Sequence, residues 1–216
     1  MFHRHLNHLE ESFPSQSPML WNVIGGAVYS HIQDPPMLER PVVLLLAGLP
    51  NSESTTRCLA TQLGSMFYDI FQSTKEPVLV FGKEYRDASG DEAKIKIDES
   101  LRSGLQTGSH CGIIHNLDDI PPCAILIFHS YCENDNAPFK DVAIVHTIQL
   151  KEGADVLGKL ERPKDYERVV SKYLRSVWEP CPDLTEDKQS AMLSRVANNV
   201  AVVKEESESQ LRKVCS

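Results

Sequence analysis

The stretch VVLLLAGLPNSEST, residues 42–55, carries the clearest indication of the fold of this chain. Its first part, Val42 to Ala47, is a continuous apolar run bounded by proline and glycine, the pattern of a strand buried on both faces. The segment from Glu53 to Phe71 carries apolar residues at helical spacing and predicts a helix. A buried strand that leads through a short polar loop into a helix is typical of parallel α/β sheets. We therefore predict a single α/β domain built around this unit.

The same alternation of strands and helices continues on both sides of residues 42–71. Further strands are predicted at 78–81, 113–114, 124–128, 142–150 and 200–203. Further helices are predicted from Ser17 to before Pro35, around Ile95 to Leu105, and over 164–178 and 185–198. Such a chain forms a central, mainly parallel sheet flanked by helices on both faces. We assign residues 1–16 to an N-terminal extension, 17–203 to the domain and 204–216 to a charged C-terminal tail.

Composition excludes several classes of protein. Hydrophobic residues make up 41% of the 216 residues, a globular share that excludes wholesale disorder. The balance of 22 basic and 30 acidic residues, net −8, makes general nucleic-acid binding a poor interpretation. The longest apolar run, Val42 to Leu49, is too short to cross a bilayer, and no signal peptide is visible. His3, His5 and His8 could chelate a metal ion, but an exposed, frayed segment is the simpler interpretation, and we predict no metal site.

Six cysteines are scattered singly along the chain, at positions 58, 111, 123, 132, 181 and 215. Structural zinc usually takes its ligands as close pairs, so this spacing disfavours a zinc site. Two interpretations remain open from the count alone. The cysteines are buried thiols in a reducing compartment, or they form one to three disulfides in an oxidising one.

The loop after the first strand has the position of a nucleotide-binding P-loop, whose pattern is G-x-x-x-x-G-K-[ST]. Gly48 and Thr55 match the ends of that pattern, but Glu53 stands in place of the second glycine and Ser54 in place of the lysine. The glycine lets backbone N–H groups curl around phosphates, and a glutamate there adds a Cβ and a negative charge. The lysine supplies the cation for the β- and γ-phosphates. The sequence thus predicts a degenerate phosphate site.

A second motif of P-loop ATPases, at the end of a later strand, is also altered. There a later apolar strand ends in an Asp-Glu pair that holds magnesium and polarises water, whereas the strand Ile113-Ile114 ends in His115-Asn116. These two side chains cannot bind magnesium as a pair of carboxylates would. Asp118 and Asp119 follow two residues late, in a turn where acidic residues are ordinary. The chain therefore has the strand order of a P-loop ATPase with a degenerate nucleotide site.

Nucleophilic catalysis is a rival interpretation. Cys132, with His115 or His129 and with Asp135, could be arranged as a Cys–His–Asp set. The chain has no G-x-S-x-G elbow and no cysteine-protease signature. A buried or disulfide-bonded Cys132 is the simpler interpretation.

The segment YCENDNAPFKDVA, residues 131–143, resembles the lumenal domain of the torsin-interacting proteins, the group that includes lamina-associated polypeptide one and its endoplasmic-reticulum relative. The resemblance continues in FPSQSP at 13–18, RCL at 57–59 and LSRV at 193–196. It covers nearly the whole chain and is looser over 83–92 and 152–182.

The resemblance implies an AAA+-like domain that binds no nucleotide or other cofactor and is not itself an enzyme. It implies that the domain docks on a torsin AAA+ ATPase, in a mixed ring or a heterodimer, and supplies an arginine finger in trans. Arg195 matches the family's finger, and ATP and magnesium would be bound by the partner. Two alternatives remain: a structural adaptor of the lumen, and an NTPase with an unconventional phosphate site.

The resemblance also implies a disulfide between Cys58 and Cys215, with Cys111, Cys123, Cys132 and Cys181 left as free or buried thiols. Family members are anchored by one membrane span upstream of this domain. We therefore expect a lumenal fragment of the endoplasmic reticulum or perinuclear space, whose C-terminal tail is tied by the disulfide.

Overall fold

The computed structural model describes residues 2–33, 40–151, 162–179 and 181–215. Its centre is a parallel sheet of five strands in the order β2-β3-β4-β1-β5. The strands are β1 (Val42–Gly48), β2 (Val78–Phe81), β3 (Cys111–His115), β4 (Ala143–Gln149) and β5 (Val200–Val203). The prediction of a parallel α/β sheet is confirmed.

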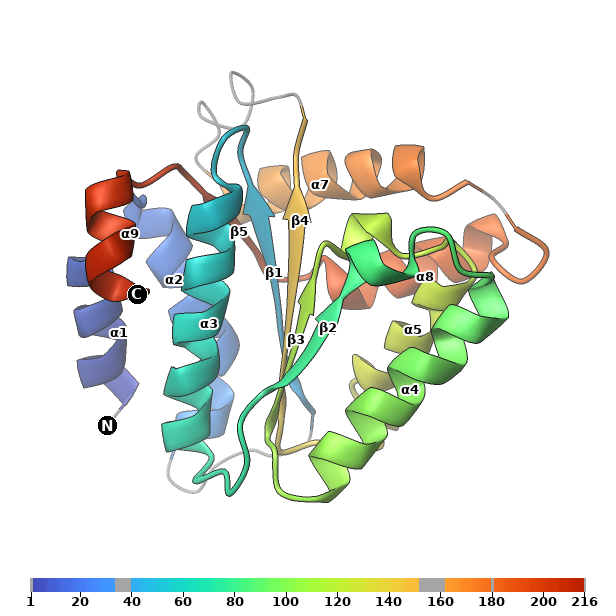
Figure 1. Ribbon diagram of the computed structural model, residues 1–216, viewed down its shortest axis with the longest axis horizontal. Helices are drawn as coiled ribbons and strands as arrows, with labels where there is room; N and C mark the ends of the chain where they lie inside the picture. Colours follow the sequence, from blue (N-terminus) through green and yellow to red (C-terminus); the bar gives the residue numbers. More distant parts are fainter. Residues whose placement is uncertain (1, 34–39, 152–161, 180, 216) are drawn as a thin grey trace.

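Helices cover both faces of the sheet (Figure 1). One face is covered by α1 (Phe2–Ser12), α2 (Pro18–Ile32) and α3 (Glu53–Ile70), with α9 (Glu208–Val214) outside α3. The other face is covered by α4 (Gly90–Gln106), α5 (Ile127–Tyr131), α7 (Pro163–Val177) and α8 (Glu186–Val196). Three short 3₁₀ turns are η1 (Gly82–Tyr85), η2 (Leu117–Asp119) and η3 (Ala124–Leu126).

Strand β1 is buried along its whole length because it contributes side chains to two hydrophobic cores, one on each face of the sheet. Val43 and Leu45 pack in the core beneath α4, α5, α7 and α8, whereas Leu44 and Leu46 pack in the core beneath α1, α2 and α3. Alternate side chains of a strand point to opposite faces, so an unbroken apolar run is required here.

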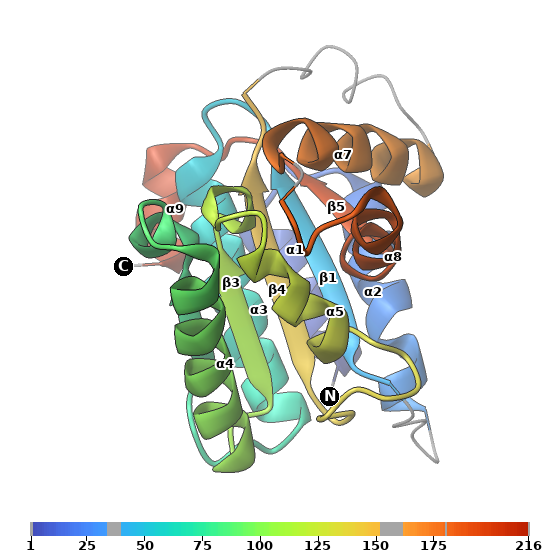
Figure 2. The same ribbon diagram turned by 90° about the vertical axis from the view of Figure 1, so that its right-hand side faces the viewer.

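The carboxyl ends of β1 and β4 form a topological switch point. The chain leaves β1 into α3 on one face of the sheet, and α7, the next described helix after the neighbouring strand β4, lies on the other face (Figures 1 and 2). Open parallel sheets bind ligands in the crevice that such a divergence leaves. The loop after Gly48 lies at this point.

The predicted strand at 124–128 is wrong. Residues 124–131 form η3 and α5 instead, with the side chains of Ile125 in η3 and Phe128 in α5 buried in the core. Strand β3 pairs directly with β4, so the sheet has no position for a strand between them. A short apolar run suits a buried strand and a buried helix equally, and tertiary packing selected the helix.

The N-terminal residues are not a frayed segment. Phe2 and Leu9 of α1, and Phe13 after it, are buried in the same core as α2 and α3. The three histidines at positions 3, 5 and 8 lie on the outer side, two exposed and His5 half-buried. The predicted end of the second helix before Pro35 agrees with the end of α2 at Ile32, and Pro35 and Pro36 lie outside the described residues.

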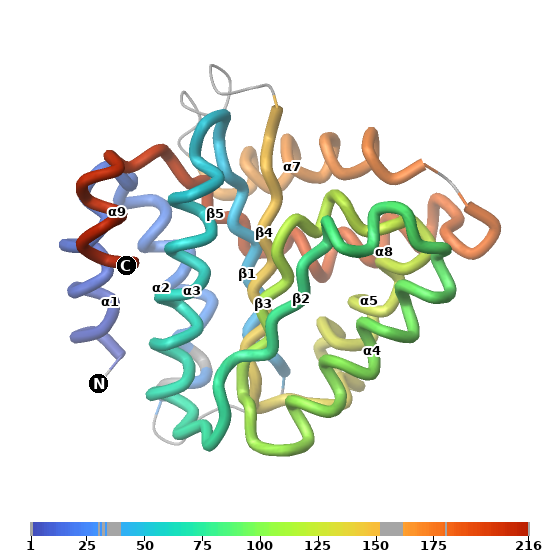
Figure 3. The backbone as a smooth tube through the Cα atoms, viewed as in Figure 1, coloured from blue at the N-terminus to red at the C-terminus, as the bar shows by residue number. Residues whose placement is uncertain are grey.

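The C-terminal segment returns to the N-terminal one, and Figure 3 shows α9 beside α1. Glu206 is buried and accepts hydrogen bonds from the backbone N and Oγ of Ser15, both at 2.8 Å. Gln210 Nε2 donates to the carbonyl oxygen of Ser12 at 2.8 Å. Residues 204–215 are thus tied to the domain by hydrogen bonds as well as by a disulfide.

Candidate functional site

The loop that follows β1 is closed on itself. Ser52 is fully buried, and its Oγ donates to the carbonyl oxygen of Leu49 at 2.7 Å, while its backbone N donates to the same oxygen at 3.0 Å. A Cβ added at Gly48 would lie 2.6 Å from both Gln149 Oε1 and Thr56 Oγ1, so any other residue there would have to displace these side chains. The loop's polar groups satisfy one another instead of facing an open cradle.

Gln149, the last residue of β4, fills the switch point. Its side-chain amide donates to the carbonyl oxygen of Leu49, across the crevice between the ends of β4 and β1. The cavity left between α3 and the ends of β3 and β4 has a volume of about 10 Å³. That is room for roughly one water molecule, whereas ligand pockets usually measure roughly 300–1,000 Å³.

Thr55, which matches the magnesium-binding hydroxyl of the P-loop pattern, faces elsewhere. It is buried, and its Oγ1 accepts a hydrogen bond from the backbone N of Glu206 at 2.9 Å. The hydroxyl therefore anchors the C-terminal segment. Ser54, at the lysine position, is exposed.

Glu53 stays charged at the start of α3. It forms an ion pair with Lys83 of η1, and that hydrogen bond lowers the pKa of the Glu53 carboxyl from its usual value. Arg57, one turn along α3, lies 3.9 Å away. The negative charge predicted to oppose phosphate binding is thus present, although Lys83 offsets part of it.

His115 ends β3 as a buried, neutral side chain. Its ring stacks on Phe81 at a centroid distance of 5.2 Å, and burial, with a smaller effect from nearby Arg57, lowers its pKa to about 4. Asn116 adopts a left-handed backbone with φ of 52°, and its N–H donates to Thr147 Oγ1 at 3.0 Å. Neither residue supplies a carboxylate at the position where P-loop ATPases have their magnesium-binding Asp-Glu pair.

Asp118 and Asp119, the two aspartates that follow β3, form their side-chain contacts with residues outside the loop after β1. Asp118 Oδ2 accepts a hydrogen bond from the Tyr173 hydroxyl of α7 at 2.8 Å, and burial raises the pKa of Asp118. Asp119 pairs with Arg86 at 2.7 Å. No group of three or more possible metal ligands occurs in the part of the chain that the structure describes.

Arg195 lies in the last turn of α8, at the other end of the sheet. Its Nε donates to Glu133 Oε2 at 2.9 Å, and Nη2 forms an ion pair with the same oxygen at 2.7 Å. Nη1 donates to the carbonyl oxygen of Ala191 at 2.7 Å. The side chain is 23% exposed and lines a cavity of about 90 Å³ that also touches Val43, near the start of β1. The structure therefore brings Glu53 of the degenerate P-loop close to His115 and Asn116 at the carboxyl ends of the strands. Arg195 lies apart from them.

Sequence reasoning missed two residues of these sites. Glu133 lies inside the segment 131–143 that carried the family resemblance, but nothing in its spacing pointed to Arg195, which is 62 residues away. Gln149 ends a strand that was predicted, and only the pairing of β4 with β1 makes it face Leu49.

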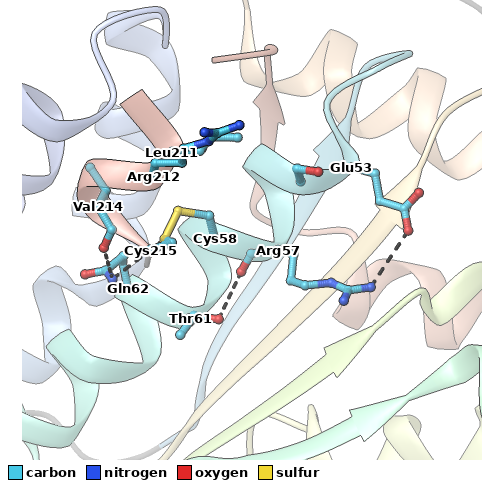
Figure 4. Close-up of a pocket in the computed structure, with 10 residues that line it drawn as sticks. Glu53, Arg57, Cys58, Thr61, Gln62, Leu211, Arg212, Val214 and Cys215 are labelled. Carbon is cyan, nitrogen blue, oxygen red and sulfur yellow. Dashed lines mark hydrogen bonds and ion pairs between the residues drawn. A yellow bond between two sulfur atoms is a disulfide. The ribbon is translucent and has the colours of Figure 1, made fainter. Parts of the chain in front are cut away.

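Cys58 and Cys215 are joined by a disulfide, the pair that the resemblance implied. The bridge lies beside a groove of about 660 Å³ between α3 and α9, whose lining includes Arg57, Leu211 and Arg212 (Figure 4). Glu53 and Ser54, at the start of α3, line one end of the same groove. Gln62 Nε2 donates to the carbonyl oxygen of Val214 at 3.0 Å. The groove is an open surface feature on the outer side of α3.

The expectation of four free cysteines is wrong for two of them. Cys123 and Cys181 form a second disulfide, which ties the start of η3 to the segment before α8. They are 58 residues apart in the chain, so only the packing of α5 against α8 brings them together. Cys111 and Cys132 are free and buried, as expected.

Cys132 does not have the surroundings of a nucleophile. Burial raises the pKa of its thiol, which keeps it protonated at neutral pH. No hydrogen bond within the described ranges joins Cys132 to His115, His129 or Asp135. The geometry gives no support to a Cys–His–Asp set.

The helices of the described ranges include none that is both long and apolar enough to cross a membrane.

Comparison with known proteins identifies similar sequences over most of the chain. Residues 1–215 match the family described as "Lamina-associated polypeptide 1, AAA+ activator domain". Torsin-1A-interacting protein 1 of Homo sapiens is 29% identical over 174 residues, which cover 81% of this chain and 29% of that protein. The protein of the same name from Bos taurus is 27% identical over 213 residues, covering 96% of this chain and 35% of that protein. The chain thus spans about a third of the length of these relatives.

A solved structure also shares the fold. The S. cerevisiae Hsp104-ADP complex superposes with a TM-score of 0.59 over 98% of this chain and 38% of that chain, at 13% sequence identity. At this identity the likeness concerns the fold alone. Together with the family match, it confirms the prediction of an AAA+-like α/β domain.

Proposed function

This chain belongs to the family of the lamina-associated polypeptide 1 AAA+ activator domain, and from that premise we propose that it activates a torsin AAA+ ATPase without hydrolysing ATP itself. The relatives of known name are torsin-1A-interacting proteins, which supports a torsin as the partner. The domain docks on the ATPase, in a mixed ring or a heterodimer, and Arg195 acts in trans on the ATP and magnesium that the partner holds.

The observation that carries the proposal is the contrast between the two ends of the sheet. At the carboxyl ends, where a P-loop protein binds its own phosphates, a cavity of about 10 Å³ remains. Near the start of β1, a partly exposed arginine is held at the surface by Glu133 and the carbonyl oxygen of Ala191. These two features favour a domain that serves another protein's nucleotide.

The chemistry of a guanidinium suits this role. It stays charged at neutral pH and presents planar donors to phosphate oxygens. An arginine placed at a transferring γ-phosphate stabilises the charge of the transition state and raises rates roughly 10³- to 10⁵-fold in other phosphoryl-transfer enzymes. Three nitrogens of Arg195 already have partners in this chain, so at least part of the Glu133 pair must rearrange when Arg195 reaches a phosphate.

The disulfides support a lumenal location. Cys58–Cys215 and Cys123–Cys181 persist in an oxidising compartment and are rare in the cytosol. We therefore place the domain in the lumen of the endoplasmic reticulum or the perinuclear space.

The test is a stimulated ATPase assay with a torsin, ATP and magnesium. The wild-type domain should raise the rate of hydrolysis, and Arg195→Ala should abolish that rise while the complex still forms in a binding assay. Arg102→Ala is the matched control, because Arg102 is an exposed arginine of α4 that pairs with Asp98 of the same helix. If Arg195→Ala stimulates as well as the wild type, the finger assignment is wrong.

The same assay separates the alternatives. A structural adaptor would bind the torsin without any change in the rate of hydrolysis. An NTPase with an unconventional phosphate site would bind ATP by itself, and micromolar binding of ATP and magnesium to the isolated domain in calorimetry would contradict our proposal.

A further inference from the structure

A groove of about 430 Å³ runs between α7 and α8, which lie next to each other on one face of the sheet (Figure 2). Its α7 wall contains Lys164, Arg168 and Arg175. These residues are 4 and 11 positions apart, and since a helix turns about 100° per residue, they lie on one face of α7. All three are exposed.

The positive charge of this α7–α8 groove is only partly compensated. Arg175 donates to Gln189 Oε1 at 3.1 Å and to Ser190 Oγ at 2.9 Å, and both acceptors are neutral. Arg168 pairs with Asp165 at 3.1 Å, but Asp165 also pairs with Arg162. Lys164 forms no ion pair with any residue in the described ranges.

A single carboxylate lines the described part of the groove. It belongs to Glu167, and burial raises its pKa. Three cations against one acid form a basic strip on a chain whose net charge is −8. Such a local excess of one sign attracts a surface of the opposite sign and steers its approach.

The groove is continuous with the site of Arg195. Ser194 and Asn198 of α8 line both the α7–α8 groove and the cavity of about 90 Å³ around Arg195. A protein that covers Arg195 on this side must therefore also lie over the groove. The basic strip is placed to contact the same partner at the same time.

We propose that the α7–α8 groove is a docking surface for an acidic segment of the ATPase that Arg195 serves, with Lys164 and Arg168 as its main contacts. This inference rests on the proposed function and adds the partner's chemistry at the docking surface. The groove sets affinity and the rate of association, whereas Arg195 acts on the chemical step. Lys164 and Arg168 are exposed in the free domain, so pairing them with carboxylates at the rim costs little desolvation.

The test is the double charge reversal Lys164→Glu with Arg168→Glu, measured in titrations of the torsin. We expect the Kd and the domain concentration for half-maximal stimulation to rise about tenfold at low salt. The maximal stimulated rate should stay unchanged. The affinity of the wild type should fall as salt is raised, and that dependence should be weaker in the variant.

Lys172→Glu is the matched control, since Lys172 is an exposed lysine of α7 that does not line the groove. It should leave the Kd within about twofold of the wild type, because a single exposed charge outside the interface contributes little free energy to binding. The milder pair Lys164→Gln with Arg168→Gln guards against misfolding, because it removes the charges without adding repulsion beside Asp165. Thermal unfolding should show that each variant is folded.

The outcomes separate this inference from the proposed function. An unchanged Kd in both double variants overturns the groove while leaving the role of Arg195 intact. An equal rise in Kd with Lys172→Glu overturns it as well, since only overall charge would then matter. A wild-type domain that fails to bind the torsin overturns both proposals. Arg195→Ala should give the opposite signature, a lost maximal rate at a retained Kd.

Discussion

Arg195 is held by Glu133 in a position that a free arginine side chain would occupy only briefly. Both side chains are half-buried, with 23% and 19% of their surface exposed, and two guanidinium nitrogens contact one carboxylate oxygen. The third nitrogen meets the carbonyl oxygen of Ala191 in the same helix. Orienting a long side chain before the reaction removes an entropy cost from the chemical step. Glu133 is therefore a positioning residue for the proposed finger.

The ion pair predicts a pH-dependent effect of Glu133→Gln on stability. A hydrogen bond to a charged group contributes about 1.5–3 kcal/mol to stability. Because this pair is partly exposed, we expect the variant to lose a smaller amount, about 1–2 kcal/mol at pH 7. Arg195 lowers the pKa of Glu133 in the folded chain, so its contribution is present above the unfolded pKa. It is lost as pH falls through the folded pKa, which lies below 4.5. Urea unfolding at pH 7 and at acid pH measures the difference.

The control for this prediction is Glu208→Gln. Glu208 pairs with Arg212 at 3.3 Å, but their side chains are 87% and 81% exposed, so its removal should change stability little. Equal losses in the two variants, or a loss from Glu133→Gln that persists unchanged in acid, would contradict our account of the Arg195 pair.

At the scale of single residues, the sequence predicted which P-loop residues are missing, but not which side chains occupy or position the two sites. Glu53 and His115 stand at positions where the pattern demands other residue types, so their identity alone predicted a degenerate site. Gln149 and Glu133 act across strands and helices that are distant in the chain. Their roles depend on the pairing of β4 with β1 and on the packing of α5 against α8, which no local pattern specifies.

Among the elements, α9 depends on attachment rather than on a core of its own. None of its residues is buried, and Leu211 and Val214 only pack against the core beneath α3. Its attachments are the disulfide Cys58–Cys215 and the hydrogen bonds of Gln62 and Gln210. A seven-residue helix is too short to be stable alone in water. The disulfide therefore determines whether α9 stays docked.

Cys215→Ser should release α9 and lower the stability of the domain. The bridge spans 157 residues, for which the chain-entropy model gives about 5 kcal/mol, an upper limit that actual losses usually do not reach. We expect a loss of about 2–5 kcal/mol in chemical unfolding. Limited proteolysis should cut within residues 208–214 much faster than in the wild type.

Cys123→Ser is the control for this prediction. It opens the other bridge, whose 58-residue separation corresponds to about 4 kcal/mol in the same model. It should destabilise the domain comparably but leave α9 protected from cleavage. Rapid cleavage of α9 in both variants would mean that global unfolding, and not the release of α9, exposes it.

Elements with strong patterns were predicted well, and those decided by packing were not. Strands at 42–47, 78–81 and 200–203 lie within one residue of β1, β2 and β5, because apolar runs bounded by turn residues are typical of buried strands. The run 124–128 has the same composition but forms η3 and α5. The helical N-terminal segment was missed because the interpretation rested on its three histidines, although Phe2, Leu6 and Leu9 recur at helical spacing.

The whole molecule has the parallel sheet of an AAA+-like fold, and the two ends of that sheet differ in their chemistry. The crevice at the carboxyl ends is filled by Gln149, and Thr55 bonds the returning C-terminal segment. Both contacts use polar groups of the degenerate phosphate loop to hold the fold together. Basic residues gather instead between α7 and α8 beside Arg195, on a chain that is acidic overall. This arrangement supports the proposal that the domain presents cations to a partner.

This division predicts that restoring the P-loop residues will not restore nucleotide binding. In Glu53→Gly with Ser54→Lys the chain regains the pattern, yet Gln149 still bonds Leu49 and Thr55 still bonds the backbone of Glu206. The cavity of about 10 Å³ must grow at least roughly thirtyfold to reach the lower size of ligand pockets. Calorimetry with ATP and magnesium should show no binding, and stimulation of a torsin through Arg195 should be retained. Micromolar affinity in this double variant would mean that residue identity alone had disabled the site, and that the closed loop and Gln149 yield readily to phosphate.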